Sequence, residues 1–131
     1  MYGFNTTVSC SMDAAVEKVT TALATEGFGI LTEIDVQAAM KKKLDLDTPP
    51  YLILGACNPS LAHQALEAEP DIGLLLPCNV VVREEANGTV IVAFMDPEAV
   101  LGIVGRDDIQ PLAKEVKARL LRVRDQVAAG S

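Results

Sequence analysis

The chain has 131 residues, half of them hydrophobic, and this length suits one domain whose core needs neither disulfides nor metals for stability. Eighteen acidic residues outnumber eleven basic ones and give a formal net charge of -7. Proteins that bind polyanions rely on an excess of basic residues, so this balance argues against nucleic acids and anionic membranes as partners.

Hydrophobic periodicity predicts alternating strands and helices in the first half of the chain. The expected elements are a strand over 2–8, a helix between Ser11 and Gly27, a strand over 28–34, and a short helix from Asp35 to about Leu44. Ser11 and Asp35 are predicted helix caps, and Gly27 stands where a helix commonly ends.

The second half opens with Tyr51–Cys57, a nearly continuous apolar run that is typical of a strand covered on both faces. Asn58 is then the expected cap and Pro59 the first residue of a helix that Pro70 ends. A further strand is predicted over 72–84, with Pro77 at a bulge or an edge because proline cannot donate to the ladder.

Asn87-Gly88, between two valine-rich runs, predicts a hairpin with a two-residue turn. Asp96-Pro97 repeats the cap-then-proline pattern after the fifth strand and opens a short helix. The last expected helix runs from about Pro111 to Ala128 and buries one apolar stripe.

The predicted order is therefore β-α-β-α-β-α-β-β-α-α, within a single domain over 1–131. We expect an α+β fold in which helices pack on a mixed sheet of about five strands. A right-handed crossover through the helix after Asn58 would make the strands that carry Cys57 and Cys78 parallel neighbours in this sheet.

Cys57 is the sharpest functional candidate, because it stands immediately before a predicted helix start. The positive end of the helix dipole and the free backbone N–H groups there favour the thiolate, which is the nucleophilic and metal-binding form of cysteine. The alternative is a small apolar core residue at a strand end. Cys10 is interpreted as such a core residue.

Cys78 and Asn79 are expected on the neighbouring strand, so Cys57, Asn58, Cys78 and Asn79 form the predicted ligand-binding set. A metal version adds His63, since thiolates and imidazole suit zinc or another thiophilic metal, with Asp96 or water as a fourth ligand. The alternative for His63 is an ordinary surface pair with Glu67, one helical turn later.

The segments Gly55-Ala56-Cys57-Asn58-Pro59 and Gly73-Leu74-Leu75-Leu76-Pro77-Cys78-Asn79-Val80 carry a resemblance. With them, the chain resembles the domain-of-unknown-function family 302, a group of small bacterial and archaeal proteins. The resemblance covers nearly the whole chain and implies a compact α+β domain whose relatives look like dimers. It implies no activity and no catalytic residue.

Three classes of function stay open. The first is a small-ligand or metal-binding sensor domain centred on the two cysteines, the second is a thiol enzyme or redox protein with Cys57 as nucleophile, and the third is a structural protein with core cysteines. Sequence motifs for phosphate, dinucleotide or zinc-protease sites are absent from the chain.

The surroundings of the protein can also be predicted. An odd cysteine count and the lack of a secretory signal or of roughly 20 consecutive apolar residues favour a cytoplasmic protein. A mean hydropathy of +0.27 in so short a chain predicts a homodimer. The hairpin formed by residues 80–82 and 90–94 is apolar on both faces, and one face can pack on the domain's own helices while the other needs a partner.

Overall fold

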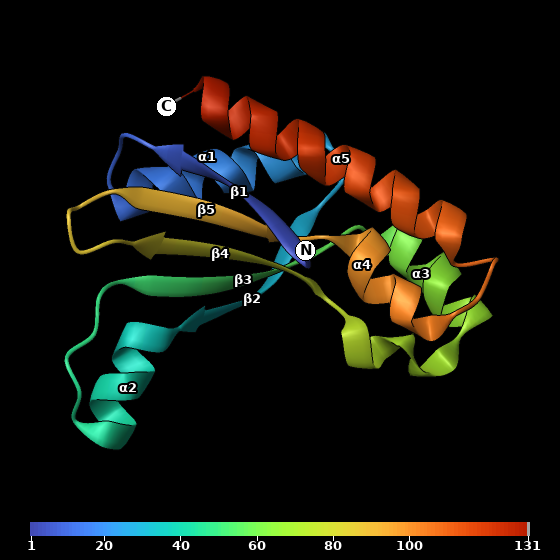
Figure 1. Cartoon of the computed structure of the whole chain (residues 1–131), viewed down its shortest axis with the longest axis horizontal. Coiled ribbons are helices and arrows are strands. Elements are labelled where there is room, and N and C mark those ends of the chain that lie inside the picture. Colours follow the sequence, from blue (N-terminus) through green and yellow to red (C-terminus); the bar gives the residue numbers. More distant parts are fainter. Residues whose placement is uncertain (131) are drawn as a thin grey trace.

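The computed structural model describes residues 1–130, and these form one five-stranded sheet in the order β1-β5-β4-β3-β2 (Figure 1). The strands are β1 Gly3–Val8, β2 Gly29–Asp35, β3 Tyr51–Cys57, β4 Cys78–Glu84 and β5 Val90–Met95. The helices are α1 Met12–Thr25, α2 Val36–Leu44, α3 Pro59–Ala68, α4 Pro97–Leu101 and α5 Gln110–Ala129, with short 3-10 helices η1 Pro70–Leu75 and η2 Gly102–Val104. The α+β class and the predicted succession of strands and helices are confirmed.

The sheet is antiparallel throughout, so the predicted parallel pairing of the two cysteine-bearing strands is wrong. In β3 and β4, Leu54 lies opposite Val80 and Ala56 lies opposite Cys78. Instead of crossing over the sheet, α3 and η1 lie beyond the end of β3 (Figure 1). The chain therefore re-enters the sheet at the end where it left.

The strand predicted over 72–84 begins later, at Cys78. Residues 72–75 belong to η1, where Ile72 is buried against the neighbouring helices. Pro77, predicted at a bulge or an edge, directly precedes β4 instead, after a cis Leu76-Pro77 peptide. A proline in this place removes no hydrogen bond from the ladder.

The predicted β4–β5 hairpin is present, but its turn is longer than two residues. The Gly88 N–H donates to the Glu85 carbonyl at 2.9 Å, and the Glu85 N–H donates to the Thr89 carbonyl. Gly88 has a φ of +85°, and the Asn87 side chain accepts a hydrogen bond from the Thr89 N–H. Asn87 and Gly88 thus end a turn that starts at Glu85.

Two apolar clusters organise the molecule. The main core lies between one face of the sheet and helices α1 and α5, and its fully buried side chains include Leu23, Leu54, Val80, Val82, Val92, Phe94, Leu120 and Val123. The second cluster lies beyond the strand ends and contains Ala65, Ile72, Leu101, Ile109 and Ala113. We call α3, η1, α4 and η2, which surround this second cluster with α5, the lobe.

The long α5 joins the two clusters, since its 20 residues extend roughly 30 Å and contribute to both. The predicted apolar stripe is present and consists of Ala113, Val116, Leu120, Val123 and Val127. Within residues 1–130, none of the helices is both long and apolar enough to cross a bilayer.

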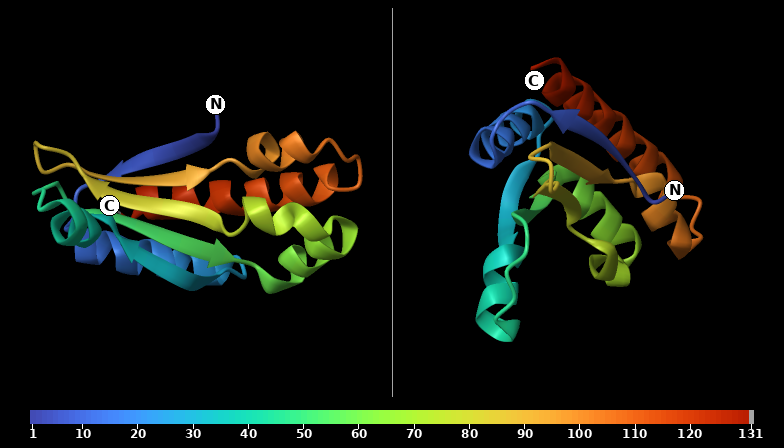
Figure 2. Two further views of the ribbon diagram at one scale, coloured as in Figure 1. Left: turned by 90° about the horizontal axis from the view of Figure 1, so that it is seen from below. Right: turned by 60° about the vertical axis from the view of Figure 1, so that its left-hand side comes forward.

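The face of the sheet opposite α1 and α5 is left open. Cross-strand pairs such as Ile53–Val81 and Val81–Ala93 place half-buried apolar side chains there. Helix α2 leaves the edge of the sheet after β2 and contacts β3 along one border (Figure 2). We call this surface the open face.

Gly55 offers a test of how tightly the β3–β4 junction is packed. A Cβ on this residue would meet the Thr32 hydroxyl and would lie 2.8 Å from Pro77 Cγ. We predict that Gly55→Ala lowers the free energy of unfolding by about 1–3 kcal/mol, as overpacking typically does. Urea denaturation measures the change.

The matched control is Gly29→Ala, also in a strand, where an added Cβ meets nothing within 4 Å. This variant should stay within about 0.5 kcal/mol of the parent protein. Equal stabilities for the two variants would contradict the packing argument.

Candidate functional site

A cavity of about 310 Å³ lies where the main core meets the lobe. Helix α3 contributes Leu61, Ala65 and Leu66 to its wall, and α5 contributes Leu112 and Val116. Alanine and glycine at several lining positions, such as Ala62 and Gly73, fill less space than larger residues would. The sequence predicted these helices as packed surfaces but gave no sign that a hollow separates them.

Cys57 and Cys78 both line this cavity. Cys57 is the last residue of β3 and Cys78 the first of β4, directly opposite Ala56. Cys57 is half-buried and Cys78 is buried, and both thiols are free. The structure therefore brings the two cysteines to one site.

The environment of this pair favours neutral thiols. Burial raises the pKa of Cys57, although the residue does stand at the start of α3. Burial, with a smaller contribution from the charge of Cys57, raises the pKa of Cys78 to about 11. Desolvation disfavours the thiolate in both cases.

Asn58 is the buried polar residue of the site, with only 7% of its surface exposed. Its Oδ1 accepts a hydrogen bond from the Leu61 N–H at 3.2 Å, which confirms the predicted cap of α3. Its Nδ2 donates to the Glu26 carbonyl at 3.4 Å. Both ends of the amide thus have protein partners.

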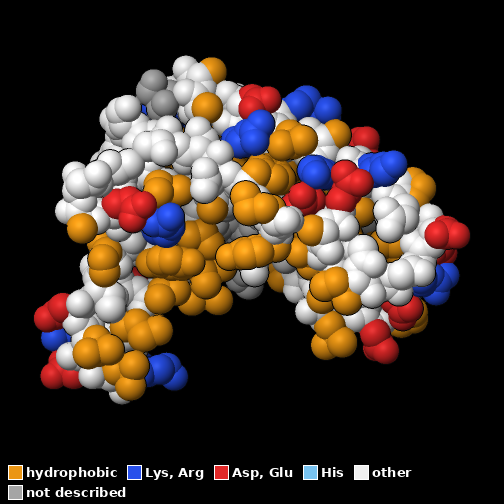
Figure 3. All heavy atoms as spheres, viewed as in Figure 1, with side chains coloured by type: hydrophobic (Ala, Val, Ile, Leu, Met, Phe, Trp, Pro, Cys, Tyr) orange, Lys and Arg blue, Asp and Glu red, His pale blue; other side chains and the backbone are white. Residues whose placement is uncertain are grey.

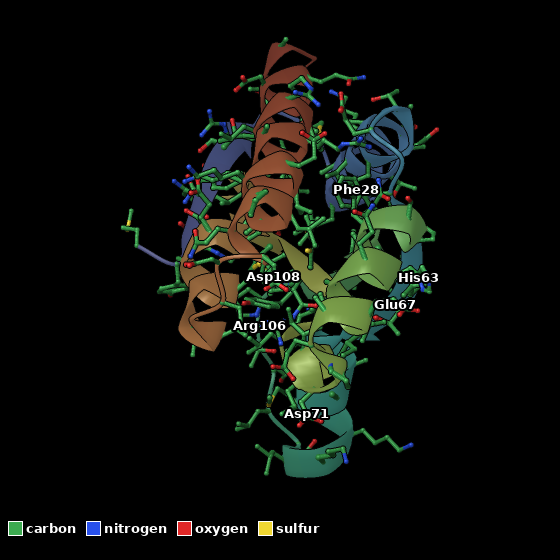
Figure 4. The ribbon with its side chains drawn as sticks, turned by 90° about the vertical axis from the view of Figure 1, so that its right-hand side faces the viewer. Phe28, His63, Glu67, Asp71, Arg106 and Asp108 are labelled. Carbon is green, nitrogen blue, oxygen red and sulfur yellow. The ribbon has the colours of Figure 1, made fainter. Side chains whose placement is uncertain are left out.

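His63 and Asn79 lie away from the cavity wall. His63 is exposed on the outer side of α3 with its Nε2 3.5 Å from Glu67, as in the surface-pair alternative (Figure 4). Asn79 pairs with Gly55 on the open face, where it lines a separate hollow with Tyr51 and Arg83. Strand alternation turns Asn79 to the side opposite Cys78.

Asp96, the candidate fourth metal ligand, has structural partners of its own. Its Oδ1 caps α4 by accepting the Glu98 N–H at 2.9 Å, and its Oδ2 lies 3.0 Å from Lys117 Nζ. Among residues 1–130, no three His, Cys, Asp or Glu side chains are grouped so that they could hold a metal ion.

Known proteins match nearly the whole length of this chain. The sequence profile of the Domain of unknown function DUF302 matches residues 4–127. In three dimensions the chain is similar to the uncharacterized conserved protein DUF302 from Bacillus stearothermophilus, known from a crystal structure. The two proteins share 30% sequence identity and superpose with a TM-score of 0.90, over 97% of this chain and 98% of that one.

None of the curated proteins matches this chain. Because the profile spans nearly all of its sequence and confirms the resemblance carried by the two cysteine segments, the chain belongs to the DUF302 family.

Proposed function

We propose that this protein is a binding domain for a small apolar ligand, which occupies the cavity beside Cys57 and Cys78. The observation that carries the proposal is the cavity itself, a hollow of about 310 Å³ walled almost entirely by apolar side chains. Ligand sites typically combine such walls with a few polar groups. Here Cys57, Asn58 and Cys78 gather at the strand ends, which makes them the polar part of the site.

The side chains that line the cavity favour a neutral ligand with few polar groups. No described lining residue is charged, and the amide of Asn58 is engaged by Leu61 and Glu26. A polyhydroxylated ligand would leave hydroxyl groups unpaired, at a cost of about 1–3 kcal/mol for each, and an unpaired charge would cost more. An apolar cavity of about 150 Å³ holds benzene, so this one suits a neutral ligand of roughly 12 non-hydrogen atoms.

We predict that the protein binds 1-decanol or naphthalene and that Ala62→Phe weakens this binding at least tenfold. Ala62 lines the cavity from α3, and a phenyl group there would occupy space that the ligand needs. Calorimetric titration measures the affinities. Ala24→Phe, at an exposed position of α1, is the matched control and should bind as the parent does.

Equal affinities for the Ala62→Phe variant and the parent would place any binding elsewhere. Lack of binding by the parent protein to both probes would contradict the proposed function itself.

A thiol enzyme using Cys57 as nucleophile is the alternative function. It needs a thiolate near neutral pH, and the raised pKa values of both cysteines oppose this. A zinc or other thiophilic ion at Cys57 and Cys78 also stays a sequence-based prediction, to which His63 adds no ligand from its outward position. Apolar binding with neutral thiols agrees better with the burial of the site.

The pKa of Cys78 gives a pH test of neutral thiols. A thiol whose pKa rises from 9.0 to about 11 on folding stabilises the fold fully below pH 9. That contribution is lost as the pH rises from 9 to about 11, and it amounts to about 2–3 kcal/mol. We predict that the free energy of unfolding falls more steeply in this window for the parent than for Cys78→Val.

Denaturation at pH 8 and at pH 10.5 measures this difference, and the valine variant controls for other groups that titrate at alkaline pH. Parallel pH profiles for the two proteins would contradict a buried neutral thiol at position 78.

We further propose a homodimer in a reducing, cytoplasmic compartment. Three free cysteines suit such a compartment. The open face supports the dimer, because Val81, Ile91 and Ala93 of the hairpin are only half-buried there. A two-fold interface of standard size would cover this face.

Light scattering should give a mass about twice the 13.9 kDa of one chain at micromolar concentration. A mass near that of one chain would refute the dimer.

A further inference from the structure

Helix α2 is exposed to an unusual degree for a helix in a folded protein. None of its nine residues is buried, and it projects from the sheet edge after β2 (Figure 1). An isolated helix shorter than about 12–15 residues is marginal in water, so such a helix normally depends on packing against another surface. We call residues 36–48, which comprise α2 and the segment after it, the arm.

The arm and the strand before it expose large apolar side chains. Ile34, Leu44 and Leu46 are 51%, 62% and 50% exposed. The hydroxyl of Thr48 is the one buried side-chain polar atom in residues 1–130 without a hydrogen-bond partner. It lines a hollow on the arm together with Gln37 and Leu46. The exposed apolar side chains indicate a surface that another molecule covers.

A notch separates the arm from the lobe, and the open face forms its roof. Figure 3 shows hydrophobic side chains gathered in this hollowed part of the molecule. The roof includes Tyr51, Ile53 and Val81, which are half-buried. An occupant of the notch would therefore meet an apolar roof between two projecting walls.

The two walls carry opposite charges. Helix α2 contains Lys41, Lys42 and Lys43 and no acidic residue, whereas the lobe has no lysine or arginine. Of the acidic residues there, Glu69 lies 3.8 Å from Arg106 and Glu98 lies 3.6 Å from Lys117. Glu67 and Asp71 are the exposed carboxylates of the lobe. Asp71 lies at the lower end of the lobe (Figure 4). Among the described residues, no ion pair joins α2 to the lobe, and Lys41 pairs instead with Asp45 and Asp47.

We propose that the occupant of the notch is the arm of a second copy of this chain, and that the two copies exchange arms reciprocally. A second copy presents both the basic helix α2, with Lys42 and Lys43, and the acidic side chains of the lobe, so a two-fold arrangement satisfies both contacts at once. Lys42 and Lys43 of each copy then face the lobe of the other copy. The exposed Leu44 and Leu46 of each arm meet the apolar roof of the other copy's notch. This arrangement rests on the proposed homodimer and specifies its interface.

Charge reversal on either wall tests the arrangement. We expect the arm variant K42E/K43E and the lobe variant E67K/D71K each to raise the Kd of self-association at least tenfold, because like charges then face each other. An equimolar mixture of the two variants should form a heterodimer with nearly the parent Kd, since both contacts again pair opposite charges. Analytical ultracentrifugation measures all three samples.

The control K18E/K114E, on α1 and α5, changes the net charge by as much as the arm variant does and should leave the Kd within about twofold. Circular dichroism verifies that each variant is folded. A parent dimer that neither variant weakens, or weakened variants that fail to pair with each other, would overturn the arm exchange and leave the homodimer intact. A monomeric parent chain would overturn both.

Discussion

The carbonyl of Glu26 connects three helices, of which α3 and α5 line the cavity. It belongs to the residue that ends α1, and it accepts hydrogen bonds from Asn58 Nδ2 at 3.4 Å and from Arg119 Nη1 at 3.0 Å. Asn58 also begins α3, and Arg119 belongs to α5, so one carbonyl links helices of the main core to the lobe. Helix ends leave backbone groups unsatisfied, and a buried group of this kind is costly without a partner. This contact fixes the start of α3 against the main core, and the second apolar cluster packs the rest of the lobe on α5.

Gly27, which follows Glu26, and Asn58 show how much of this region could be predicted from the sequence. Gly27 was predicted as a helix end and Asn58 as a helix cap, and both predictions are confirmed by a φ of +85° and by the bond from Leu61. Their proximity was not foreseen, although a Cβ on Gly27 would lie 2.8 Å from Asn58 Nδ2. Caps and turns follow from residues within one helical turn, whereas this contact joins positions 31 residues apart. Rules that use only neighbouring residues do not specify such long-range contacts. The direction of β4 also depends on long-range contacts, and it was predicted wrongly for the same reason.

The direction of β4 decides whether a two-cysteine site exists. Cys57 ends its strand and Cys78 begins the next, so a parallel arrangement of these strands would have placed them at opposite ends of the sheet, roughly 20 Å apart. The antiparallel arrangement brings them to the same end, where both reach one cavity. The sequence analysis correctly expected the two strands to be neighbours, but it gave them the wrong relative direction. The outward positions of His63 and Asn79 follow from helical phase and strand alternation, once the start of each element is known.

The lobe has an apolar inner surface and an acidic outer surface. The proposed ligand site uses the first, and the proposed arm exchange uses the second. The inner surface, with Leu61 and Ala65, lines the cavity, and on the outer surface Glu67 and Asp71 face solvent. A ligand would contact α3 from within, while the arm of a second copy would contact the lobe from outside. If ligand binding moves α3 relative to Glu26, and with it the acidic surface of the lobe, the affinity between copies changes as well. By linkage, dimer formation would then change ligand affinity by the same factor. The bond between Asn58 and Glu26, which fixes the start of α3, is the physical element through which such coupling would act.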